Sequence, residues 1–597
     1  MSPTPLPRWA TMEKPQNLWK TMFRLYRYIG KYRLHIYAGI LLSFVSSVLV
    51  LIAPQYLNEI VDIISASVGT SVPMDVERIL GIVWILVVLY SVAALFRAAS
   101  GYIIPSASEF NGNVMRIDLN KKITRLPLKI IDGMNIGDIM SRFTNDTDNI
   151  RNQSAECISH TIVAFTMIIG SFMMMCIMEW HLALIAIAPT VVGLVIIFTV
   201  INRSQPLFKD LSVDTGAING LVEETYYGLD AVNQYNGRQR ARDRFRDVND
   251  RLFRITCITR TISSSMPNII GFISNLSYVF VCIAGSMMII DGKIGFGVVV
   301  AFFIYVKHFT EPMGRLSNSL ASMQTVSASS ERVFEFLDQP EMPSEDGCRQ
   351  PPERASGSVV FENVCFSYNP GREVIHNLNL EIMPGQKIAI VGPTGSGKTT
   401  IANLLMRFYE LDSGRILVDG IDIRELRKED VHRIFCMILQ DSWMFEGSIR
   451  QNLTFGEDID DETLLSACES VGMERYIESL PDRLDTVIDD AMSISVGQRQ
   501  QINIARAIIR DSPIVILDEA TSAVDPFTER KIQKAMNEIM ESHTSFVIAH
   551  RLSTIEDADM ILVIKDGSII EKGKHEELLA KGGFYRQLYD SQFESCE

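Results

Sequence analysis

The segment KIAIVGPTGSGKTT, residues 387–400, joins a short apolar run to a glycine-rich loop. It matches the pattern G-x-x-x-x-G-K-[ST] in the strand, loop and helix context that this pattern requires. In such a loop the backbone N–H groups surround the phosphates, Lys398 reaches the β- and γ-phosphates, and the Thr399 hydroxyl binds magnesium. The sequence therefore predicts a nucleotide triphosphate site. Its loop residues are Gly392, Pro393, Thr394, Gly395, Ser396, Gly397, Lys398, Thr399 and Thr400.

A second apolar run, IVILDEATSAVD at residues 514–525, ends in two adjacent carboxylates. Asp518 is expected to hold Mg²⁺ through its hydration shell, and Glu519 to polarise an attacking water. Carboxylates can end a strand without any catalytic role, but their pairing with the phosphate loop favours nucleotide hydrolysis. Three further segments belong to the same half of the chain: MILQD with Gln440, SISVGQRQQINIARA at 493–507, and FVIAHRLST with His550.

The whole chain is too long and too apolar for one soluble domain. It has 597 residues, of which 47% are hydrophobic and 21% charged, whereas domains usually hold roughly 100 to 200 residues. Residues 1–357 carry 32 Lys and Arg against 30 Asp and Glu, while residues 358–597 carry 24 against 41. The net charge of -15 therefore comes from the second half, and no basic footprint for nucleic acid is expected.

The first half contains six apolar runs, each near the roughly 20 residues that a membrane-spanning helix needs. Runs such as ILGIVWILVVLYSVAALF have no polar face, which disfavours buried helices of a soluble protein. Lys and Arg gather before the first run and in the connections 104–156 and 202–265, so these segments are expected to face the cytoplasm. The sequence predicts a multi-pass protein of the cell (inner, cytoplasmic) membrane. The runs are 34–57, 79–103, 157–178, 181–201, 266–290 and 294–316.

The sequence also suggests where each part begins. Residues 19–28 mix aromatic and cationic side chains, which suits a helix at the membrane interface, although an ordinary cytosolic helix would share this composition. The stretch DQPEMPSEDGCRQPPERASG is rich in Pro, Glu and Ser and reads as a linker. The expected order is a cytoplasmic N-terminus (1–33), a transmembrane domain (34–337), the linker (338–357) and the nucleotide-binding domain (358–597).

Three ionisable residues lie inside the last apolar run, in FFIYVKHFTEP. Ionisable groups within the bilayer often mark substrate pathways. Lys307 and Glu311 are one helical turn apart, so they could equally form a self-neutralising ion pair. Both interpretations remain open for Lys307, His308 and Glu311.

The order of motifs in the second half resembles the ATP-binding-cassette (ABC) family: Tyr368, the phosphate loop, Gln440, an SxGQ signature, LDEATSAVD and His550. The six-run half, with GDIMSRFTND at 137–146, looks like the ABC exporter fold. The implied fold class is an α-helical membrane domain with long cytoplasmic extensions plus an α/β nucleotide-binding domain. The resemblance implies that ATP and Mg²⁺ are cofactors, that Tyr368 stacks on adenine, and that Gln440 senses Mg²⁺ and the γ-phosphate.

The resemblance implies further roles. Glu519 would be the catalytic base, His550 would contact the γ-phosphate, and Asp525 would communicate across a dimer. The regions around 137–146 and 224–235 would contain the coupling helices that dock on the nucleotide domains.

In this family each nucleotide lies between the phosphate loop of one cassette and the signature of another, so the chain is expected to dimerise. Its signature residues toward ATP would be Ser495, Gly497 and Gln498. This signature departs from the usual LSGGQ, with Ile494 for Leu and Val496 for Gly, and branched Val adds bulk near a phosphate. A heterodimer with a second half-transporter is favoured, with a homodimer as the alternative.

The implied function is ATP-driven export of a lipophilic substrate such as a drug, lipid or peptide. Import by an exporter-like fold, as in siderophore systems, is an alternative. A third possibility is an ATP-gated channel or regulator, but such proteins can dispense with hydrolysis and Glu519 is present. No feature of the sequence names the substrate.

Overall fold

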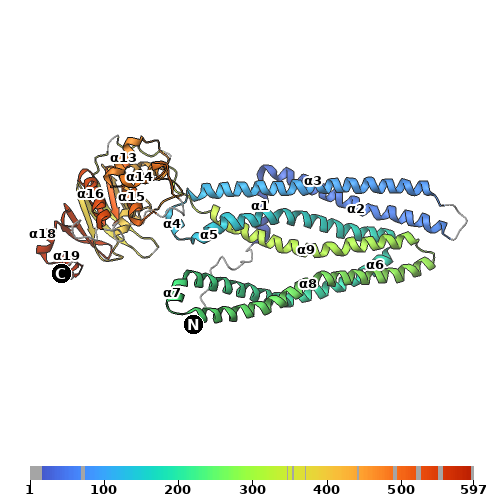
Figure 1. Cartoon of the computed structure of the whole chain (residues 1–597). Helices are drawn as coiled ribbons and strands as arrows, with labels where there is room; N and C mark the ends of the chain where they lie inside the picture. Colours follow the sequence, from blue (N-terminus) through green and yellow to red (C-terminus); the bar gives the residue numbers. More distant parts are fainter. Residues whose placement is uncertain are drawn as a thin grey trace. The chain divides into compact units, whose positions relative to one another are not determined.

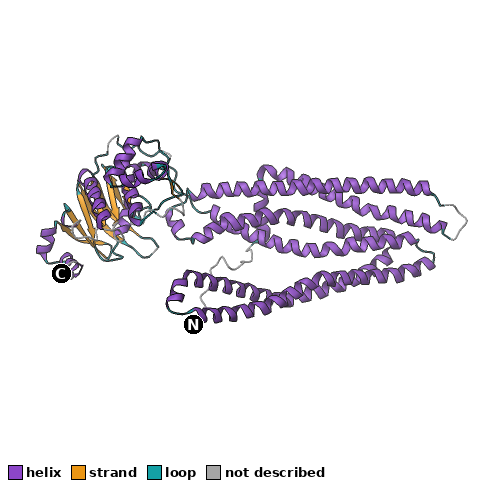
Figure 2. Ribbon diagram, in the orientation of Figure 1, coloured by secondary structure: helices purple, strands orange, loops and turns teal. Residues whose placement is uncertain are grey.

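The structure is a computed structural model that describes residues 17–592, apart from 69–73, 346, 353–354, 370, 440–442, 489–493, 519–525 and 549–554. The chain divides into two compact units (Figure 1). The helical unit comprises residues 1–125 and 134–339, and the α/β unit comprises residues 126–133 and 340–597. All strands drawn in Figure 2 belong to the α/β unit.

The helical unit consists of long helices. Its elements are α1 (Leu18–Tyr28), η2 (Gly30–Tyr32), α2 (Arg33–Ser67), α3 (Val76–Ile123), α5 (Ile136–Ser141), the π-helix η3 (Arg142–Asp146), α6 (Thr147–Tyr227), α7 (Leu229–Gln234), α8 (Arg238–Ile290) and α9 (Phe296–Leu337). Within the described residues, five helical stretches are long and apolar enough to span a membrane.

One of these five stretches contains two of the predicted runs. Glu179, inside α6, has φ -162° and ψ 104°, which is extended backbone that an α-helix cannot contain. It divides α6 into two helices, with the apolar runs 157–178 and 181–201 on either side. The expected helical membrane region is confirmed, and each of its six apolar runs lies on a helix.

Small residues allow these helices to approach one another closely. A Cβ at Gly170 would lie 2.2 Å from a side-chain carbon of Leu51, and one at Gly193 would lie 2.1 Å from Ile273. The Tyr305 hydroxyl donates to the Leu51 carbonyl at 2.9 Å. Because lipid provides no hydrophobic drive between helices, close packing and interhelical hydrogen bonds hold such bundles together.

Helix α1 is fastened to the far end of α9. The Arg24 guanidinium donates to both carboxylate oxygens of Asp338, at 2.6 and 2.7 Å, and the Thr21 hydroxyl donates to Glu331 at 2.9 Å. Trp19 and Phe23 are 79% and 67% exposed. The polar face of α1 therefore binds protein and its aromatic face is open, which suits the predicted position at a membrane interface.

The α/β unit contains three sheets. A four-stranded antiparallel sheet has the order β2 (Ile375–Ile382), β1 (Val359–Phe366), β4 (Ser413–Val418), β5 (Ile421–Asp422). A six-stranded sheet has the order β12 (Ser568–Gly573), β11 (Met560–Lys565), β3 (Lys387–Val391), β10 (Thr544–Ile548), β9 (Ile514–Asp518), β6 (Phe435–Ile438). Strands β7 (Gly447–Ser448) and β8 (Val487–Ile488) pair with each other.

The α/β unit also contains helices. They are α4 (Leu128–Asp132), α10 (Lys398–Leu405), α11 (Lys428–Ile434), α12 (Ile449–Thr454), α13 (Asp461–Ser470), α14 (Glu474–Ser479), η4 (Arg483–Asp485), α15 (Val496–Arg510), α16 (Pro526–Ser542), α18 (His575–Lys581) and α19 (Phe584–Gln592). Strand β3 is buried on both faces of the sheet. Ile388 and Ile390 belong to one buried apolar cluster, and Ala389 and Val391 belong to another. Parallel strands buried on both faces read as continuous apolar runs, as KIAIV does.

Candidate nucleotide-binding site

The phosphate loop connects the end of β3 to the first turn of α10, as the sequence predicts. Gly395 has φ 82° and Gly397, the N-cap of α10, has φ 105°. Only glycine adopts such backbone readily. A Cβ at Gly392 would lie 2.2 Å from the Ile564 carbonyl oxygen, so a side chain is excluded there by the neighbouring strand β11. The loop therefore needs glycine for both conformation and space.

Lys398 lies inside this loop. Its ammonium donates to the carbonyls of Gly392 at 2.8 Å and Pro393 at 3.1 Å, and the residue is 8% exposed. Burial lowers the pKa of Lys398, while the nearby carboxylate of Asp518 opposes that shift. A cation is thus held at the centre of the loop, with a carboxylate close by.

Two features of the loop fit a bound triphosphate. The Ser396 hydroxyl is buried and has no hydrogen-bond partner among the described residues. Such a group costs free energy unless it is satisfied. The first turn of α10 adds backbone N–H groups that favour an anion, and Thr399 is exposed on that turn. The donor set, the central cation and the unsatisfied hydroxyl all suit phosphate oxygens.

Asp518 reaches the loop because of the strand order. It ends β9, which lies next to β10, and β10 lies next to β3. These strands are parallel, and Asp518 is in register with Ile548, so their carboxyl ends meet at one edge of the sheet, where ligands bind in α/β folds. Of the other predicted residues, Gln440, Glu519, Asp525 and His550 lie outside the described residues.

Tyr368 belongs to a buried aromatic cluster beside α10. Its ring centroid is 4.9 Å from that of Phe366 and 5.0 Å from that of Tyr409, both in edge-to-face geometry. Its hydroxyl donates to the Thr400 hydroxyl at 3.2 Å and accepts from the Asn403 side chain at 3.4 Å. The structure thus brings Tyr368 against the helix that carries Lys398.

The signature residues form the N-terminus of α15. The Ser495 hydroxyl accepts from the Gln498 backbone N–H at 3.2 Å, and the Gln498 side chain accepts from the Ser495 N–H at 2.9 Å. This reciprocal cap satisfies two helix donors. Gly497 is buried, while Val496 is 49% exposed. The branched side chain that replaces glycine therefore projects from the surface of this chain.

The docking segment of the first inner loop lies just before the predicted one. Residues 126–133, with α4, belong to the α/β unit, whereas GDIMSRFTND forms α5 and η3 in the helical unit. Leu126 is 4% exposed and Leu128 packs against the apolar cluster of the four-stranded sheet. Lys129 donates to the Ser367 carbonyl at 3.4 Å. The short apolar run LPLKIID is the sequence feature that could have predicted this segment.

The charges of GDIMSRFTND bind α9 instead. Arg332 of α9 pairs with Asp138 at 2.6 Å and with Asp146 at 3.1 Å, and Arg142 pairs with Asp138 at 3.0 Å. Burial raises the pKa of Asp146, and its neighbours Arg332 and Ser329 oppose that shift. Removing one partner from such a buried network is costly, so the motif stabilises the helical unit. The second proposed docking region, 224–235, lies in the helical unit, and its role stays a prediction.

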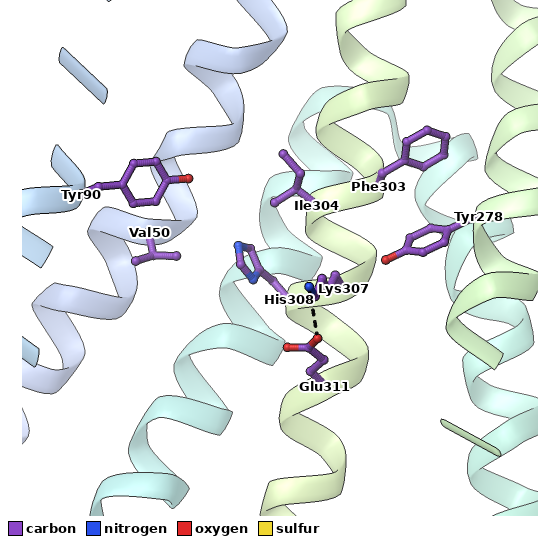
Figure 3. A pocket seen from close by; sticks show the side chains of 8 residues that line it. All are labelled: Val50, Tyr90, Tyr278, Phe303, Ile304, Lys307, His308 and Glu311. Carbon is purple, nitrogen blue, oxygen red and sulfur yellow. Dashed lines mark ion pairs between the residues drawn. The ribbon is translucent and has the colours of Figure 1, made fainter. Parts of the chain in front are cut away.

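The helical unit contains a cavity of about 630 Å³ among α2, α3, α8 and α9 (Figure 3). The ammonium of Lys307 and the carboxylate of Glu311 are 3.5 Å apart, and the two side chains are 59% and 52% exposed. The ion pair forms and its two residues also line the cavity, so a role in a substrate pathway stays a prediction. The lining residues are Val50, Tyr90, Tyr278, Phe303, Ile304, Lys307, His308 and Glu311.

Comparison with known proteins agrees with this architecture. Residues 36–313 match the family described as the ABC transporter transmembrane region, and residues 375–522 match the family described as ABC transporter. The chain belongs to the ABC transporter family.

Its relatives are transporters of several kinds. A fatty acid ABC transporter ATP-binding/permease protein of Mycobacterium bovis is 40% identical, over 86% of this chain and 81% of the relative. The ATP-dependent lipid A-core flippase of Salmonella typhimurium is 35% identical, over 80% and 83%. A probable multidrug resistance ABC transporter ATP-binding/permease protein of Bacillus subtilis is 32% identical, over 84% and 75%.

Membership of this family settles the class of activity. The chain is a multi-pass membrane protein that binds ATP and couples its hydrolysis to transport. ABC exporters work as dimers, so a second copy or a second half-transporter completes the molecule.

Proposed function

We propose that this chain is one half of an exporter that moves a lipid-like amphiphile with an anionic headgroup out of the cytoplasm, across the inner cell membrane. The cavity in the helical unit is the observation that carries this substrate class. Val50, Phe303 and Ile304 offer apolar surface for an acyl chain. Lys307, His308, Tyr90 and Tyr278 offer hydrogen-bond donors, against the single carboxylate of Glu311.

The arrangement of these polar groups suits an acceptor-rich headgroup. In Figure 3 the Tyr278 hydroxyl points toward α9, and Lys307 and Glu311 face one another. A charge within the membrane is costly unless it is paired. An anionic headgroup beside Lys307 would therefore gain a favourable interaction with the ammonium. The names of two relatives, a fatty acid transporter and a lipid A-core flippase, support the same class.

In the nucleotide site we propose that Lys398 and the loop N–H groups bind the phosphates and that Tyr368 stacks on adenine. Thr399 and Gln440 would hold Mg²⁺, and Asp518 would do so through water. The ion would neutralise phosphate charge. Glu519 would act as the general base toward water, and His550 would contact the γ-phosphate. The intact loop and the proximity of Asp518 to Lys398 support these roles.

The direction of transport is tested in proteoliposomes that contain the reconstituted dimer and a fluorescent short-chain phosphatidylglycerol. ATP added outside drives only molecules whose nucleotide domains face outward. We expect ATP to move the lipid into the inner leaflet, where dithionite cannot quench it. Loss of protected lipid instead would indicate import, and no ATP-dependent change would contradict this substrate class.

Replacing Lys307 with alanine is expected to lower ATP-dependent movement of this anionic lipid by about tenfold or more, because hydrogen bonds to a charged group are the strong ones. The Lys307→Arg variant keeps the cation and should retain most transport. Glu311→Gln should raise apparent affinity for the lipid, since Lys307 loses its competitor. Equal loss in all three variants would instead mean that the ion pair is only structural.

We further propose that the partner is a different half-transporter. The sequence retains Glu519 and His550, which would act on the nucleotide at this chain's own phosphate loop, but Val496 of its signature would face the nucleotide of the partner. We expect the chain purified alone to have ATPase activity at least about tenfold below that of the complex with its partner. Robust activity of the chain alone would establish the homodimer.

A further inference from the structure

Tyr409 connects the adenine side of the nucleotide site to the segment 126–133. The residue is 9% exposed and follows α10 in the α/β unit. Its hydroxyl donates to a carboxylate oxygen of Asp132 in α4. Its ring meets Tyr368 edge to face, with centroids 5.0 Å apart and planes at 88°. One buried side chain thus touches both the proposed adenine platform and the docked inner loop.

The contacts on each side of Tyr409 are well defined. Tyr368 is held by Thr400 and Asn403 on α10, so its ring has little freedom to move without its neighbours. Phe366 contacts both rings, with its centroid 5.6 Å from that of Tyr409 and 4.9 Å from that of Tyr368. Since close-packed interiors transmit small displacements rather than absorbing them, a change in the position of Tyr368 would be felt by the Tyr409 ring.

The hydrogen bond between Tyr409 and Asp132 has a defined direction. Burial, followed by the bond to Asp132, raises the pKa of Tyr409 above its usual range. The phenol therefore remains protonated and donates, and the Asp132 carboxylate accepts. The chain continues from α4 into α3 on one side and α5 on the other, both in the helical unit.

We propose that Tyr409 is a positioning residue that relays occupancy of the adenine platform, through Asp132, to the inner-loop segment 126–133. The relay rests on the proposed role of Tyr368. It distinguishes the base of the nucleotide from its phosphates: the phosphates act at Lys398, whereas the base acts at Tyr368. Binding of phosphates alone would leave α4 unchanged.

Hydrogen exchange of the full-length, reconstituted protein tests the relay without knowledge of the substrate. We compare the magnesium complexes of a non-hydrolysable ATP analogue and of inorganic tripolyphosphate, each at a concentration that fully protects the phosphate-loop peptide 392–400. The analogue should change exchange in the peptide covering 126–133 by at least about threefold, and tripolyphosphate should not. An equal change with both ligands would overturn the proposal.

The Tyr409→Phe variant keeps the ring and removes the hydrogen bond. We expect the analogue still to protect 392–400 but to leave 126–133 unchanged, and Asp132→Asn should behave in the same way. Tyr476→Phe, a hydroxyl deletion elsewhere in the α/β unit, is the matched control and should respond like the unaltered protein. A full response of 126–133 in Tyr409→Phe would refute the relay.

A second readout separates a relay from a merely structural contact. Tyr409→Phe should hydrolyse ATP with a KM within about twofold of the unaltered protein, but should move less fluorescent phosphatidylglycerol per ATP. Loss of hydrolysis and of thermal stability together would show a structural contact only. If the unaltered protein shows no protection of 392–400, the nucleotide assignment itself fails, which is a different result from failure of the relay.

Discussion

Replacing Lys398 with alanine is expected to reduce ATP hydrolysis by at least about 100-fold, because phosphoryl transfer depends on positioning and on neutralising charge. The Lys398 ammonium is held by two loop carbonyls at 2.8 and 3.1 Å, so it is placed before the nucleotide arrives. Lys398→Arg should also be impaired, since the residue is only 8% exposed and the larger guanidinium does not fit the same position. Phosphate release by the reconstituted protein measures the effect.

The control for Lys398→Ala is Lys534→Ala on α16. The side chain of Lys534 is 80% exposed and pairs with Glu538 on the surface, so its removal should change activity by less than about twofold. A Lys398→Ala variant with full ATPase activity would refute the assignment of the phosphate loop.

Replacing Glu519 with glutamine is expected to slow hydrolysis by about 100-fold to 10,000-fold, the usual contribution of a general base. The change keeps the size of the side chain but removes its basicity. ATP binding should persist, so the two nucleotide domains should remain closed around it. Retention of radiolabelled ATP after gel filtration, together with single-turnover phosphate release, measures both effects.

Asp518→Asn serves as the comparison for Glu519→Gln, since it should weaken Mg²⁺-dependent nucleotide binding rather than spare it. Transport at the normal rate by Glu519→Gln would show that hydrolysis at this site is dispensable. That result would favour an ATP-gated channel or regulator over a pump.

The parts of the fold that the sequence predicts well have strong local signals. The strand at 387–391, the glycine-rich loop after it and the strand that ends at Asp518 each follow from a short contiguous pattern. The apolar runs predict helices because the bilayer imposes one length and one composition on every spanning segment. The break at Glu179 was marked in the same way, by the polar interruption between two such runs.

The parts that the sequence did not predict depend on contacts between distant residues. Tyr409 and Asp132 are 277 positions apart, and neither lies in a motif that identifies it as functional. The charged motif at 137–146 was expected to dock on the nucleotide domain, yet its carboxylates pair with Arg332, which only the fold brings near. The role of Lys307 was likewise open in the sequence, because its spacing from Glu311 fits both an ion pair within the helix and a position beside a cavity.

The attachment of α1 to the end of α9 affects how the protein is made. Arg24 and Asp338 are separated by 314 positions, so α1 leaves the ribosome long before its partner at the end of α9 has been synthesised. Contacts between such distant residues form late. The helical unit can therefore be completed only after its last helix has been synthesised. This makes the salt bridge between Arg24 and Asp338 a marker of the completed helical unit, which crosslinking during synthesis would detect.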